Sequence, residues 1–459
     1  MSLSIVILAA GQGTRMRSAL PKVLHPLGGQ PLLAHVIETA RALRPERILV
    51  VYGHGGEQVR TTLADAPVEW IEQTEQLGTG HAVDQAMPAV PDEDSLLVLY
   101  ADVPLIRADT LAALVHEAEA GRLAVLTAEL DEPAGYGRML RDRDGRLSGI
   151  VEHKDATPEQ RAIREINTGF LAAPAARLRG WLAHLDNANA QGEYYLTDVL
   201  AMAVADGVEV AAVCVQDADE ILGVNDRIQL AHLERVLQDR HARTLMREGV
   251  TLADPARIDI RGSLRAGQDC VIDINVVFEG EVELGRRVHI GPGCVIRDTR
   301  IGDDVQVQAH CVIEQAQIGR DSRIGPFARI RPETRLAEGV HVGNFVEIKK
   351  SDIDQGSKIN HLSYIGDTHM GRAVNIGAGT ITCNYDGARK HRTDIGNRVF
   401  VGSDTQLVAP VKVGDGATIG AGSTITRDVP AEKLTLSRVS QKTIEGWQRP
   451  VKNSGKRKD

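Results

Sequence analysis

The chain has 459 residues, of which 42% are hydrophobic, 25% charged and 3% aromatic, and its formal net charge is -9. This length predicts two or three domains, and the composition is that of an ordinary globular protein. The negative charge argues against a general nucleic-acid binder, so we expect no nucleic-acid partner and expect local cations wherever an anionic ligand binds.

The cysteines and the first residues bear on location. Five cysteines, an odd number without CxxC spacing, fit a reducing compartment. The chain opens without a charged start followed by an apolar segment and a cleavage site, and no apolar run reaches about 18 residues. We therefore expect a cytoplasmic protein that does not associate with membranes.

The first half of the chain alternates strand and helix patterns. Strands are expected over residues 4–10 (SIVILAA), 47–53 (RILVVYG) and 95–106 (SLLVLYADVPLI), and a helix from about Pro31 to Arg44. Alternation of this kind predicts an α/β domain with a mostly parallel sheet covered by helices. Ligands of such sheets bind beyond the carboxyl ends of the strands, so the residues just after strands are the first candidates.

A glycine loop follows the first strand, reading Gly11-Gln12-Gly13-Thr14-Arg15-Met16. Glycines let backbone amides approach phosphate oxygens, and the arginine adds a fixed positive charge. Methionine replaces the third glycine of a dinucleotide fingerprint, and no GK[ST] follows, which excludes a Walker A loop. A phosphate-binding loop and a tight turn that simply needs two glycines both remain open on these residues alone.

The strand over residues 95–106 contains Asp102 just after its apolar part. A carboxylate at the carboxyl end of a strand can hold Mg²⁺ beside a nucleotide. The alternative is an Asx turn ahead of Pro104. Further along, one helix is expected from Asn225 to Gly249, with leucines on one stripe and the glycine ending it.

From Leu284 to about Pro430 an aliphatic residue returns every six positions, often followed by glycine. The last run is Ile395, Val401, Leu407, Val413, Ile419, Ile425. A six-residue repeat predicts a parallel β-helix in which three short strands make one coil and each aliphatic side chain points into a narrow core. The hand of the coil does not follow from the spacing.

The hexad register breaks after Ile376, where residues 380–394 read TITCNYDGARKHRTD. A solenoid accommodates an insertion as a loop directed outward, and such loops tend to carry function. Arg331 and Lys349 each follow an inward position, so they should face outward from adjoining coils and could hold a phosphate. His361 lies two residues after inward Ile359 and is also expected to be exposed, where a histidine can accept a proton near neutral pH.

The string from Leu8 to Met16, followed by Pro21-Lys22, resembles the signature of sugar-nucleotide pyrophosphorylases. The resemblance implies that Arg15 clamps the triphosphate and that Lys22 contacts the sugar phosphate. The segment 73–81 resembles the part of that family which reads uracil and sugar, and Asp102 would hold Mg²⁺ together with Asn225. Without the family, the segment would be a helix-starting turn capped by Thr79. The substrate-binding set that the resemblance implies is Leu8, Ala9, Ala10, Gly11, Lys22, Gln73, Gly78, Thr79, Tyr100, Ala101, Asp102, Gly137, Glu152, Asn167 and Asn225. Ala101 departs from the pattern, because the family usually has glycine there.

The second half resembles an acetyltransferase through residues 360–367 (NHLSYIGD), 375–379 (NIGAG) and the NYDG loop. Over nearly its whole length, the chain resembles a family of bacterial bifunctional enzymes. Members of this family are both N-acetylglucosamine-1-phosphate uridyltransferases and glucosamine-1-phosphate N-acetyltransferases. The resemblance implies that His361 is the base that deprotonates the amino group of glucosamine 1-phosphate. Arg331, Lys349, Tyr364 and Asn375 would hold that substrate. The implied acetyl-CoA contacts are Ala378, Asn384, Tyr385, Ser403, Ala421 and Arg438.

The resemblance also implies an architecture and partners. It predicts a Rossmann-like nucleotidyltransferase domain over 1–226, a linker helix over 227–249, and a left-handed β-helix over 250–459 that ends in a disordered basic tail from Val451. The implied reactants are acetyl-CoA, UTP and the two sugar phosphates, with Mg²⁺ as cofactor, a homotrimer as the assembly, and a product that feeds cell-wall and lipopolysaccharide synthesis. Two alternatives remain open: a single-function pyrophosphorylase with a regulatory or oligomerising β-helix, and a solenoid that serves only as a structural stem.

Overall fold

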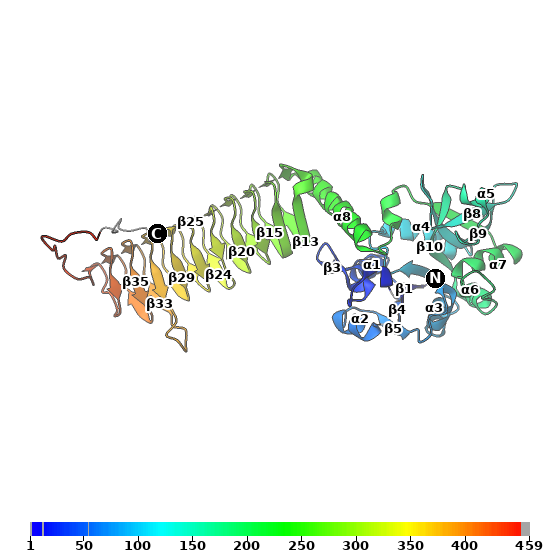
Figure 1. Ribbon diagram of the computed structural model, residues 1–459, viewed down its shortest axis with the longest axis horizontal. Helices are drawn as coiled ribbons and strands as arrows, with labels where there is room; N and C mark the ends of the chain where they lie inside the picture. Colours follow the sequence, from blue (N-terminus) through cyan, green and yellow to red (C-terminus); the bar gives the residue numbers. More distant parts are fainter. Residues whose placement is uncertain (1, 12, 54, 451–459) are drawn as a thin grey trace, which may run out of the picture. The chain divides into compact units, whose positions relative to one another are not determined.

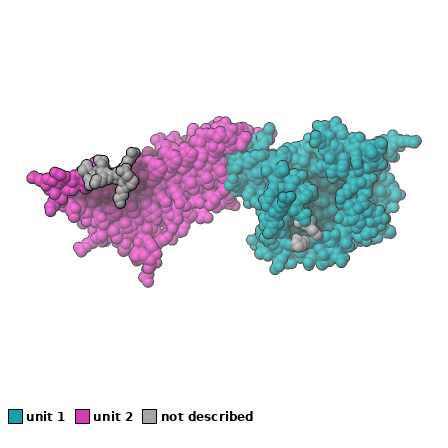
Figure 2. All heavy atoms as spheres, in the orientation of Figure 1, with its two compact units in different colours: residues 1–244, 258–262 teal, residues 245–257, 263–459 magenta. Residues whose placement is uncertain are grey.

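The computed structural model describes residues 2–11, 13–53 and 55–450 and divides into two compact units (Figure 2). Unit 1 comprises residues 1–244 and 258–262, and unit 2 comprises residues 245–257 and 263–459. The tail expected from Val451 lies outside the described residues. Among the described residues, no helix is long and apolar enough to cross a membrane.

Unit 1 is built on a twisted sheet with the strand order β11-β7-β10-β6-β1-β4-β5 (Figure 1). All neighbours in this order are parallel except β10, which is antiparallel to both β6 and β7. The strands are β1 Leu3–Ala9, β4 Arg47–Tyr52, β5 Glu69–Glu72, β6 Ser95–Tyr100, β7 Leu123–Glu129, β10 Glu165–Pro174 and β11 Val210–Cys214. A hairpin of β8 Gly137–Arg141 and β9 Leu147–Val151 is attached to β10, and β2 Pro26–Leu27 pairs with β3 Gln30–Pro31.

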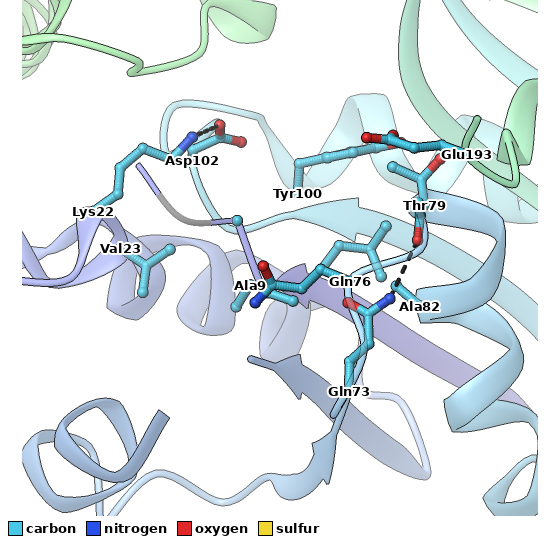
Figure 3. Close-up of a pocket in the computed structure, with 14 residues that line it drawn as sticks. Ala9, Lys22, Val23, Gln73, Gln76, Thr79, Ala82, Tyr100, Asp102 and Glu193 are labelled. Carbon is cyan, nitrogen blue, oxygen red and sulfur yellow. Dashed lines mark hydrogen bonds and ion pairs between the residues drawn. The ribbon is translucent and has the colours of Figure 1, made fainter. Parts of the chain in front are cut away.

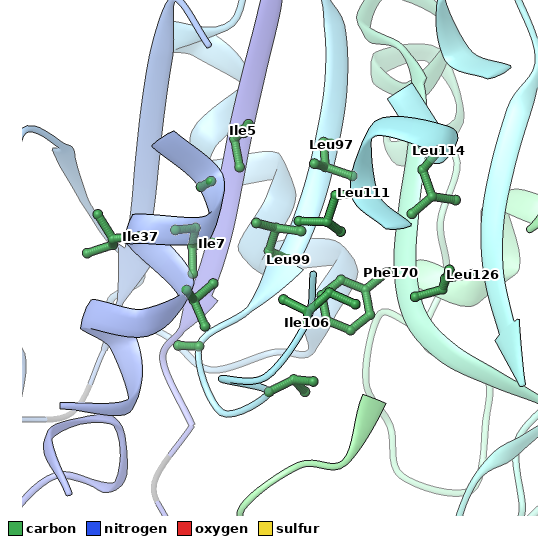
Figure 4. Packing of buried hydrophobic residues seen from close by; sticks show 14 of the residues in the cluster. Ile5, Ile7, Ile37, Leu97, Leu99, Ile106, Leu111, Leu114, Leu126 and Phe170 are labelled. Carbon is green, nitrogen blue, oxygen red and sulfur yellow. The ribbon is translucent and has the colours of Figure 1, made fainter. Parts of the chain in front are cut away.

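Helices cover both faces of this sheet because its strands are apolar on both sides. Ile5 and Ile7 of β1 pack with α1 and α4 on one face, together with Leu97 and Leu99 of β6 (Figure 4). Val6 packs on the opposite face against α3, α6 and α7. The helices of the chain are α1 Leu32–Ala42, α2 Gly56–Thr62, α3 Thr79–Ala86, α4 Ala108–Glu119, α5 Pro158–Arg161, α6 Ala175–Leu182, α7 Val199–Ala205 and α8 Arg227–Arg247. The expected mostly parallel α/β fold is confirmed.

The start of α8 belongs to unit 1. Leu233 and Leu237 pack with Met16, Leu27 and the buried Val224 in a small separate cluster. The expected leucine stripe therefore exists, and it anchors the segment around Asn225 beside the loop that follows β1.

Unit 2 is a solenoid of short parallel strands that pair with the strand three positions along the chain. One face is formed by β12 Thr251–Leu252, β14 Val271–Ile272, β16 His289–Ile290, β19 Gln306–Val307, β22 Arg323–Ile324, β25 His341–Asn344, β28 Lys358–His361, β31 Asn375–Ile376, β34 Phe400–Val401, β37 Thr418–Ile419 and β39 Leu434–Thr435. The second column is β17 Val295–Arg297, β20 Val312–Glu314, β23 Arg329–Ile330, β26 Glu347–Lys349, β29 Tyr364–Gly366, β32 Ile381–Cys383, β35 Gln406–Val408 and β38 Thr424–Ile425. The third is β18 Arg300–Ile301, β21 Ala316–Ile318, β24 Thr334–Leu336, β27 Asp352–Ile353, β30 Thr368–Met370, β33 Thr393–Ile395 and β36 Val411–Val413. The longer strands β13 Ile258–Ala266 and β15 Val276–Leu284 form the first turns.

The hexad residues fill the inside of the solenoid. Every aliphatic position of the last run, from Ile395 to Ile425, is buried, and so are Ile330, Ile348 and Ile359. Three strands make one coil, as the spacing predicts. The fold is the hexapeptide-repeat left-handed parallel β-helix that the resemblance implies.

The register break after Ile376 is smaller than its sequence suggests. Thr382 occupies an inward position at full burial, and β32 and β33 continue the columns on either side of the insertion. Only residues 384–392 lie between these strands. A threonine can fill the core there because its hydroxyl accepts a hydrogen bond from the amide of Gly366 at 2.8 Å.

Candidate functional site

Unit 1 has a cavity of ≈ 380 Å³ beyond the carboxyl ends of β1 and β6 (Figure 3). This is the position at which parallel α/β sheets bind ligands. Its lining is Leu8, Ala9, Ala10, Gly11, Lys22, Val23, Gln73, Gln76, Gly78, Thr79, Ala82, Tyr100, Asp102 and Glu193. Ten of these fourteen residues belong to the set chosen from the sequence, so one cavity brings together segments that lie far apart along the chain.

Lys22 and Arg15, which are expected to bind phosphate, contact Asp102 and Asn225, which are expected to bind a metal ion. Lys22 Nζ donates to Asp102 Oδ2 at 2.5 Å and lies 3.4 Å from Asn225 Oδ1. Arg15 Nη2 donates to the same Asn225 oxygen at 3.0 Å. The four residues therefore form one network, although Arg15 and Asn225 are not part of the cavity lining.

Gly13 explains how Lys22 reaches this network. Its φ is +60°, and a Cβ placed on Gly13 would lie 2.6 Å from Lys22 Cβ. Only glycine permits both this backbone conformation and so close an approach. The second glycine of the loop is thus required for packing against the lysine as well as for the turn.

Gln73 and Thr79 shape the other side of the cavity. The buried Gln73 donates from Nε2 to the carbonyl of Gly78 at 3.3 Å (Figure 3). A helix does start here, as the alternative to the family interpretation has it, but Thr79 is the first residue of α3 and the cap position is Gly78. The Thr79 hydroxyl instead accepts a hydrogen bond from the amide of Leu196 at 3.1 Å.

Gly137, Glu152 and Asn167 come together next to the cavity. Gly137 pairs with Asn167 across β8 and β10, and a Cβ on Gly137 would lie 3.4 Å from Glu152 Oε1. Burial raises the pKa of Glu152. Burial, and then the charges of Glu152 and Asp102, also raise the pKa of Tyr100. Ala101 is fully buried and presents no surface to a ligand.

Glu193 and Thr197 are residues of this site that were not identified from the sequence. Glu193 lines the cavity, and the Thr197 hydroxyl donates to Glu152 Oε1 at 3.3 Å. Their segment reaches the site through backbone bonds of Tyr194 with Leu77 and Gly80. The sequence of this segment has no helical or strand periodicity. Its place in the site therefore becomes visible only from the hydrogen bonds between loops in the folded chain.

The donor atoms of Asp102 and Asn225 suit a hard divalent cation. Both are oxygens, and Mg²⁺ is commonly held by one or two protein oxygens with water and substrate phosphates completing its shell. Within the described ranges, no group of three or more His, Cys, Asp or Glu side chains is arranged to hold a metal ion. A cation bound here would therefore depend on ligands from outside the protein.

The second constellation lies on unit 2, on neighbouring coils. Ile330 pairs with Ile348, so the following residues Arg331 and Lys349 project from adjoining coils as expected. Arg331 donates to Glu347 at 2.6 Å. Contact with the ammonium group of Lys390, which comes from the inserted loop, lowers the pKa of Lys349.

His361 is exposed at the end of β28, as the hexad register predicts. Its Nδ1 lies 3.0 Å from Asn344 Oδ1 on the preceding coil. Because an amide oxygen only accepts hydrogen bonds, Nδ1 carries the proton and the lone pair of Nε2 is free. Asn344 was not identified from the sequence, since its hexad position marks it only as a corner residue.

Tyr364 of β29 and Asn384, which follows β32 on the next coil, lie close together. Asn384 Nδ2 lies 3.4 Å from the Tyr364 hydroxyl and donates to Asp367. Gly366 leaves room for this contact, because a Cβ on it would lie 2.4 Å from the Tyr364 hydroxyl oxygen. Asn384 is buried and Tyr385, beside it, is exposed, so the inserted loop starts on a fixed residue.

The inserted loop is closed on itself. Asp386 accepts from the amides of Ala388 and Arg389, and its other oxygen lies 2.6 Å from His391 Nε2. These bonds hold the pKa of Asp386 well below its usual range, with the Arg389 amide as the largest cause. These bonds within the loop, together with the bond from the His391 amide to the carbonyl of buried Asn384, fix the segment that carries Lys390.

The remaining candidates stack at one corner of the solenoid. Asp404 donates from its amide to Ala378, Gly422 to Ser403, and Arg438 from Nη1 to Ala421 at 3.0 Å. Ala378, Ser403 and Ala421 thus lie above one another, and Arg438 bends back over the last of them. Asn375 lies on β31, directly beside Lys358 of β28.

Three family models match the sequence. The MobA-like NTP transferase domain matches residues 5–253, the GMPPB C-terminal domain matches residues 260–351, and the bacterial transferase hexapeptide (six repeats) matches residues 392–427. The first match covers more than half of the chain.

Curated relatives match nearly the full length. The bifunctional protein GlmU of Alkalilimnicola ehrlichii is 61% identical over 98% of this chain and 97% of the relative. The proteins of the same name from Chromobacterium violaceum and Methylococcus capsulatus are each 60% identical, over 99% and 98% of this chain and 100% and 98% of their own lengths.

Proposed function

The chain belongs to the family of the bifunctional protein GlmU, and from this premise we propose that the two constellations described above are its two active sites. The protein is a bifunctional enzyme of UDP-N-acetylglucosamine biosynthesis. Its hexapeptide domain transfers acetyl from acetyl-CoA to glucosamine 1-phosphate, and its NTP transferase domain transfers uridylyl from UTP to the acetylated product with release of pyrophosphate. We place the domain limits at 1–226 and 250–459, with a linker over 227–249.

In the uridylyl reaction, a phosphate oxygen of N-acetylglucosamine 1-phosphate attacks the α-phosphorus of UTP, and the bond to pyrophosphate breaks. Arg15 holds the triphosphate and Lys22 the sugar phosphate, so that two anions lie side by side in line for displacement. The backbone of Leu8–Gly11 and the amide of Gln73 receive the nucleotide. Gly137, Glu152 and Asn167 receive the sugar.

The donor set of Asp102 and Asn225 supports Mg²⁺ as the cofactor of this domain. When bound, the ion neutralises phosphate charge as the leaving group departs. The protein residues supply orientation and cationic charge, and no protein base is needed, since the attacking phosphate oxygen is already anionic.

In the acetyl reaction, the amino nitrogen of glucosamine 1-phosphate attacks the thioester carbonyl, the carbon–sulfur bond breaks, and coenzyme A leaves as the thiol. His361 Nε2 takes the proton from nitrogen and passes it to the departing sulfur, so that coenzyme A is released as the thiol, and Asn344 keeps the opposite ring nitrogen protonated. Arg331 and Lys349 hold the sugar phosphate, and Tyr364 and Asn375 orient the sugar. Acetyl-CoA lies along the corner of Ala378, Ser403 and Ala421, with Asn384, Tyr385 and Arg438 as its side-chain contacts.

We further propose a homotrimer in the cytoplasm. The solenoid supports an assembly through an exposed ladder of stacked rings, in which His310 lies 5.1 Å from Phe327 and Phe327 lies 5.4 Å from Phe345, measured between ring centroids. Both phenylalanines are about half exposed, which is costly for a monomer in water. A mass near three chains of 49.6 kDa by light scattering tests this proposal.

The observation that carries the assignment is that each unit has its own polar constellation outside its core. The test uses the full chain with glucosamine 1-phosphate, acetyl-CoA and UTP, and follows thiol release and pyrophosphate release separately. Thiol release should need no UTP, and pyrophosphate release from added N-acetylglucosamine 1-phosphate should need no acetyl-CoA. Strict dependence of either reaction on the other's co-substrate would contradict two independent sites.

A further inference from the structure

Lys22 lies where a bound cation would lie. Its ammonium group contacts Asp102 Oδ2 at 2.5 Å, as Figure 3 shows, and Asn225 Oδ1 at 3.4 Å, the two oxygens of the proposed metal site. Arg15 uses the same Asn225 oxygen at 3.0 Å. The residues that should hold substrate phosphates thus hold the metal ligands instead.

This contact is not an ordinary surface ion pair. The Lys22 and Asp102 side chains are only 11% and 22% exposed, and they come from segments 80 residues apart. Gly13 packs directly against the stem of Lys22, which fixes where the ammonium group can reach. Charges with so little water around them interact strongly, because the local dielectric is lower than that of bulk water.

A divalent cation and the ammonium group compete for one carboxylate. Both carry positive charge, so their mutual repulsion weakens the binding of a cation to Asp102 Oδ2 while Lys22 stays in contact with it. If Lys22 left Asp102 without finding another anion, its ammonium group would remain unpaired in a poorly hydrated position, which is energetically costly. A phosphate group of the substrate is the anion that the site is built to receive.

We propose that Lys22 is an internal counter-ion that occupies the divalent-cation site of unit 1 until a substrate phosphate draws it away. The inference rests on the proposed function, because it takes Asp102 and Asn225 as the metal ligands. It makes cation binding and phosphate binding cooperative: the cation binds weakly to the free enzyme, and each ligand increases the affinity of the other by the same factor.

The test measures Mn²⁺ binding to the full chain without substrates, by the electron paramagnetic resonance signal of free Mn²⁺. Lys22→Gln removes the competing charge and should bind Mn²⁺ about tenfold more tightly than the wild type, within the usual range of coupling between sites. Lys22→Met serves as a second neutral variant if the first does not fold. Lys22→Arg keeps the charge and should bind as weakly as the wild type.

Lys154→Gln is the matched control. Apart from Lys22, Lys154 is the one lysine in the described part of unit 1. It is exposed, and its ammonium group donates to Gln191. This variant changes the net charge by the same amount and should leave Mn²⁺ affinity unchanged. An equal gain in Lys154→Gln and Lys22→Gln would reduce the effect to overall charge and overturn the proposal.

A second arm adds N-acetylglucosamine 1-phosphate, corrected for the Mn²⁺ that the sugar phosphate binds in the absence of protein. It should increase Mn²⁺ affinity in the wild type and much less in Lys22→Gln. An equal increase in both proteins would overturn the proposed competition.

Asp102→Asn separates this inference from the function it rests on. Loss of Mn²⁺ binding in Asp102→Asn, with no gain in Lys22→Gln or Lys22→Met, would refute the counter-ion alone and leave the metal site intact. Unchanged Mn²⁺ binding in Asp102→Asn would refute the metal site itself, and the counter-ion with it.

Discussion

The two sites of this protein are assembled in opposite ways. In unit 1 the contact between Arg15 and Asn225 joins residues 210 positions apart, whereas in unit 2 His361 and Asn344 are 17 positions apart, one coil of the solenoid. Their electrostatics differ too: Lys22 is paired with a carboxylate, but Lys349 lies beside another ammonium group. The first site pairs its lysine with a carboxylate. In the second site Arg331 is paired with Glu347, while Lys349 and Lys390 lie side by side as two cations that a phosphate could bridge.

The largest expected effect tests whether the two sites are independent. Asp102→Ala should lower uridylyl transfer by more than about a thousandfold, because it removes the carboxylate that we propose as a cation ligand. Acetyl transfer should remain at the wild-type rate. The two rates are measured on the same preparation, and an equal loss of both would make Asp102 a folding residue.

His361→Ala should give the reverse pattern. Loss of the base should lower acetyl transfer by about 10²- to 10³-fold, the usual contribution of a positioned general base. Uridylyl transfer from supplied N-acetylglucosamine 1-phosphate should not change. Thiol release at saturating acetyl-CoA provides the measurement, and a normal rate would remove His361 from the mechanism.

Gly13→Ala tests whether unit 1 depends on close backbone packing. The φ of +60° and the 2.6 Å approach to Lys22 Cβ should displace the lysine and lower kcat/KM for the sugar phosphate about tenfold. Gly121→Ala is the control, since its φ of +84° is also positive but nothing lies within 4 Å of the added carbon. Similar kinetics for both variants would show that Gly13 serves the turn alone.

Lys390→Met tests the pair of neighbouring ammonium groups in unit 2. The neighbouring ammonium group lowers the pKa of Lys349, so the native enzyme loses the Lys349 charge at a lower pH than an isolated lysine would. Removing Lys390 should move the alkaline limb of kcat/KM for glucosamine 1-phosphate to higher pH, even though the maximum falls. Lys412→Met, on an exposed lysine, should not move the limb.

The smallest effect concerns stability. Because burial raises the pKa of Glu152, the charged carboxylate destabilises the fold above that pKa, and Glu152→Gln should stabilise the protein by about 1 kcal/mol or less. The gain should be complete at pH 8, begin to shrink as the pH falls through the raised pKa, and vanish below the ordinary pKa of a glutamate, where the carboxyl is protonated in both the folded and the unfolded chain. Thermal melts at pH 8 and at a pH below that ordinary pKa, with the exposed Glu132→Gln as control, provide the measurement. A gain that is independent of pH would exclude a charge effect.

Much of this protein can be predicted from its sequence. The hexad period determined the solenoid, its three-strand coils and the outward direction of His361, because a repeat of six leaves no other way to bury its aliphatic residues. The motifs around Arg15, Lys22 and Asp102 identified the first activity of the family, and residues 360–367, 375–379 and the NYDG loop identified the second, which the full-length relatives confirm. The mostly parallel sheet followed from the alternation of strands and helices.

Tertiary structure alone decided how the charges are paired. The sequence marks Lys22 and Asp102 as separate candidates, and only the folded chain brings them into contact, because that distance depends on how the loop after β1 packs against the end of β6. The same holds for Asn344 beneath His361, for Thr197 beside Glu152 and for Lys390 beside Lys349. Periodicity and motifs report which residues face outward, whereas the contact between two outward side chains depends on coils and loops that no local pattern encodes.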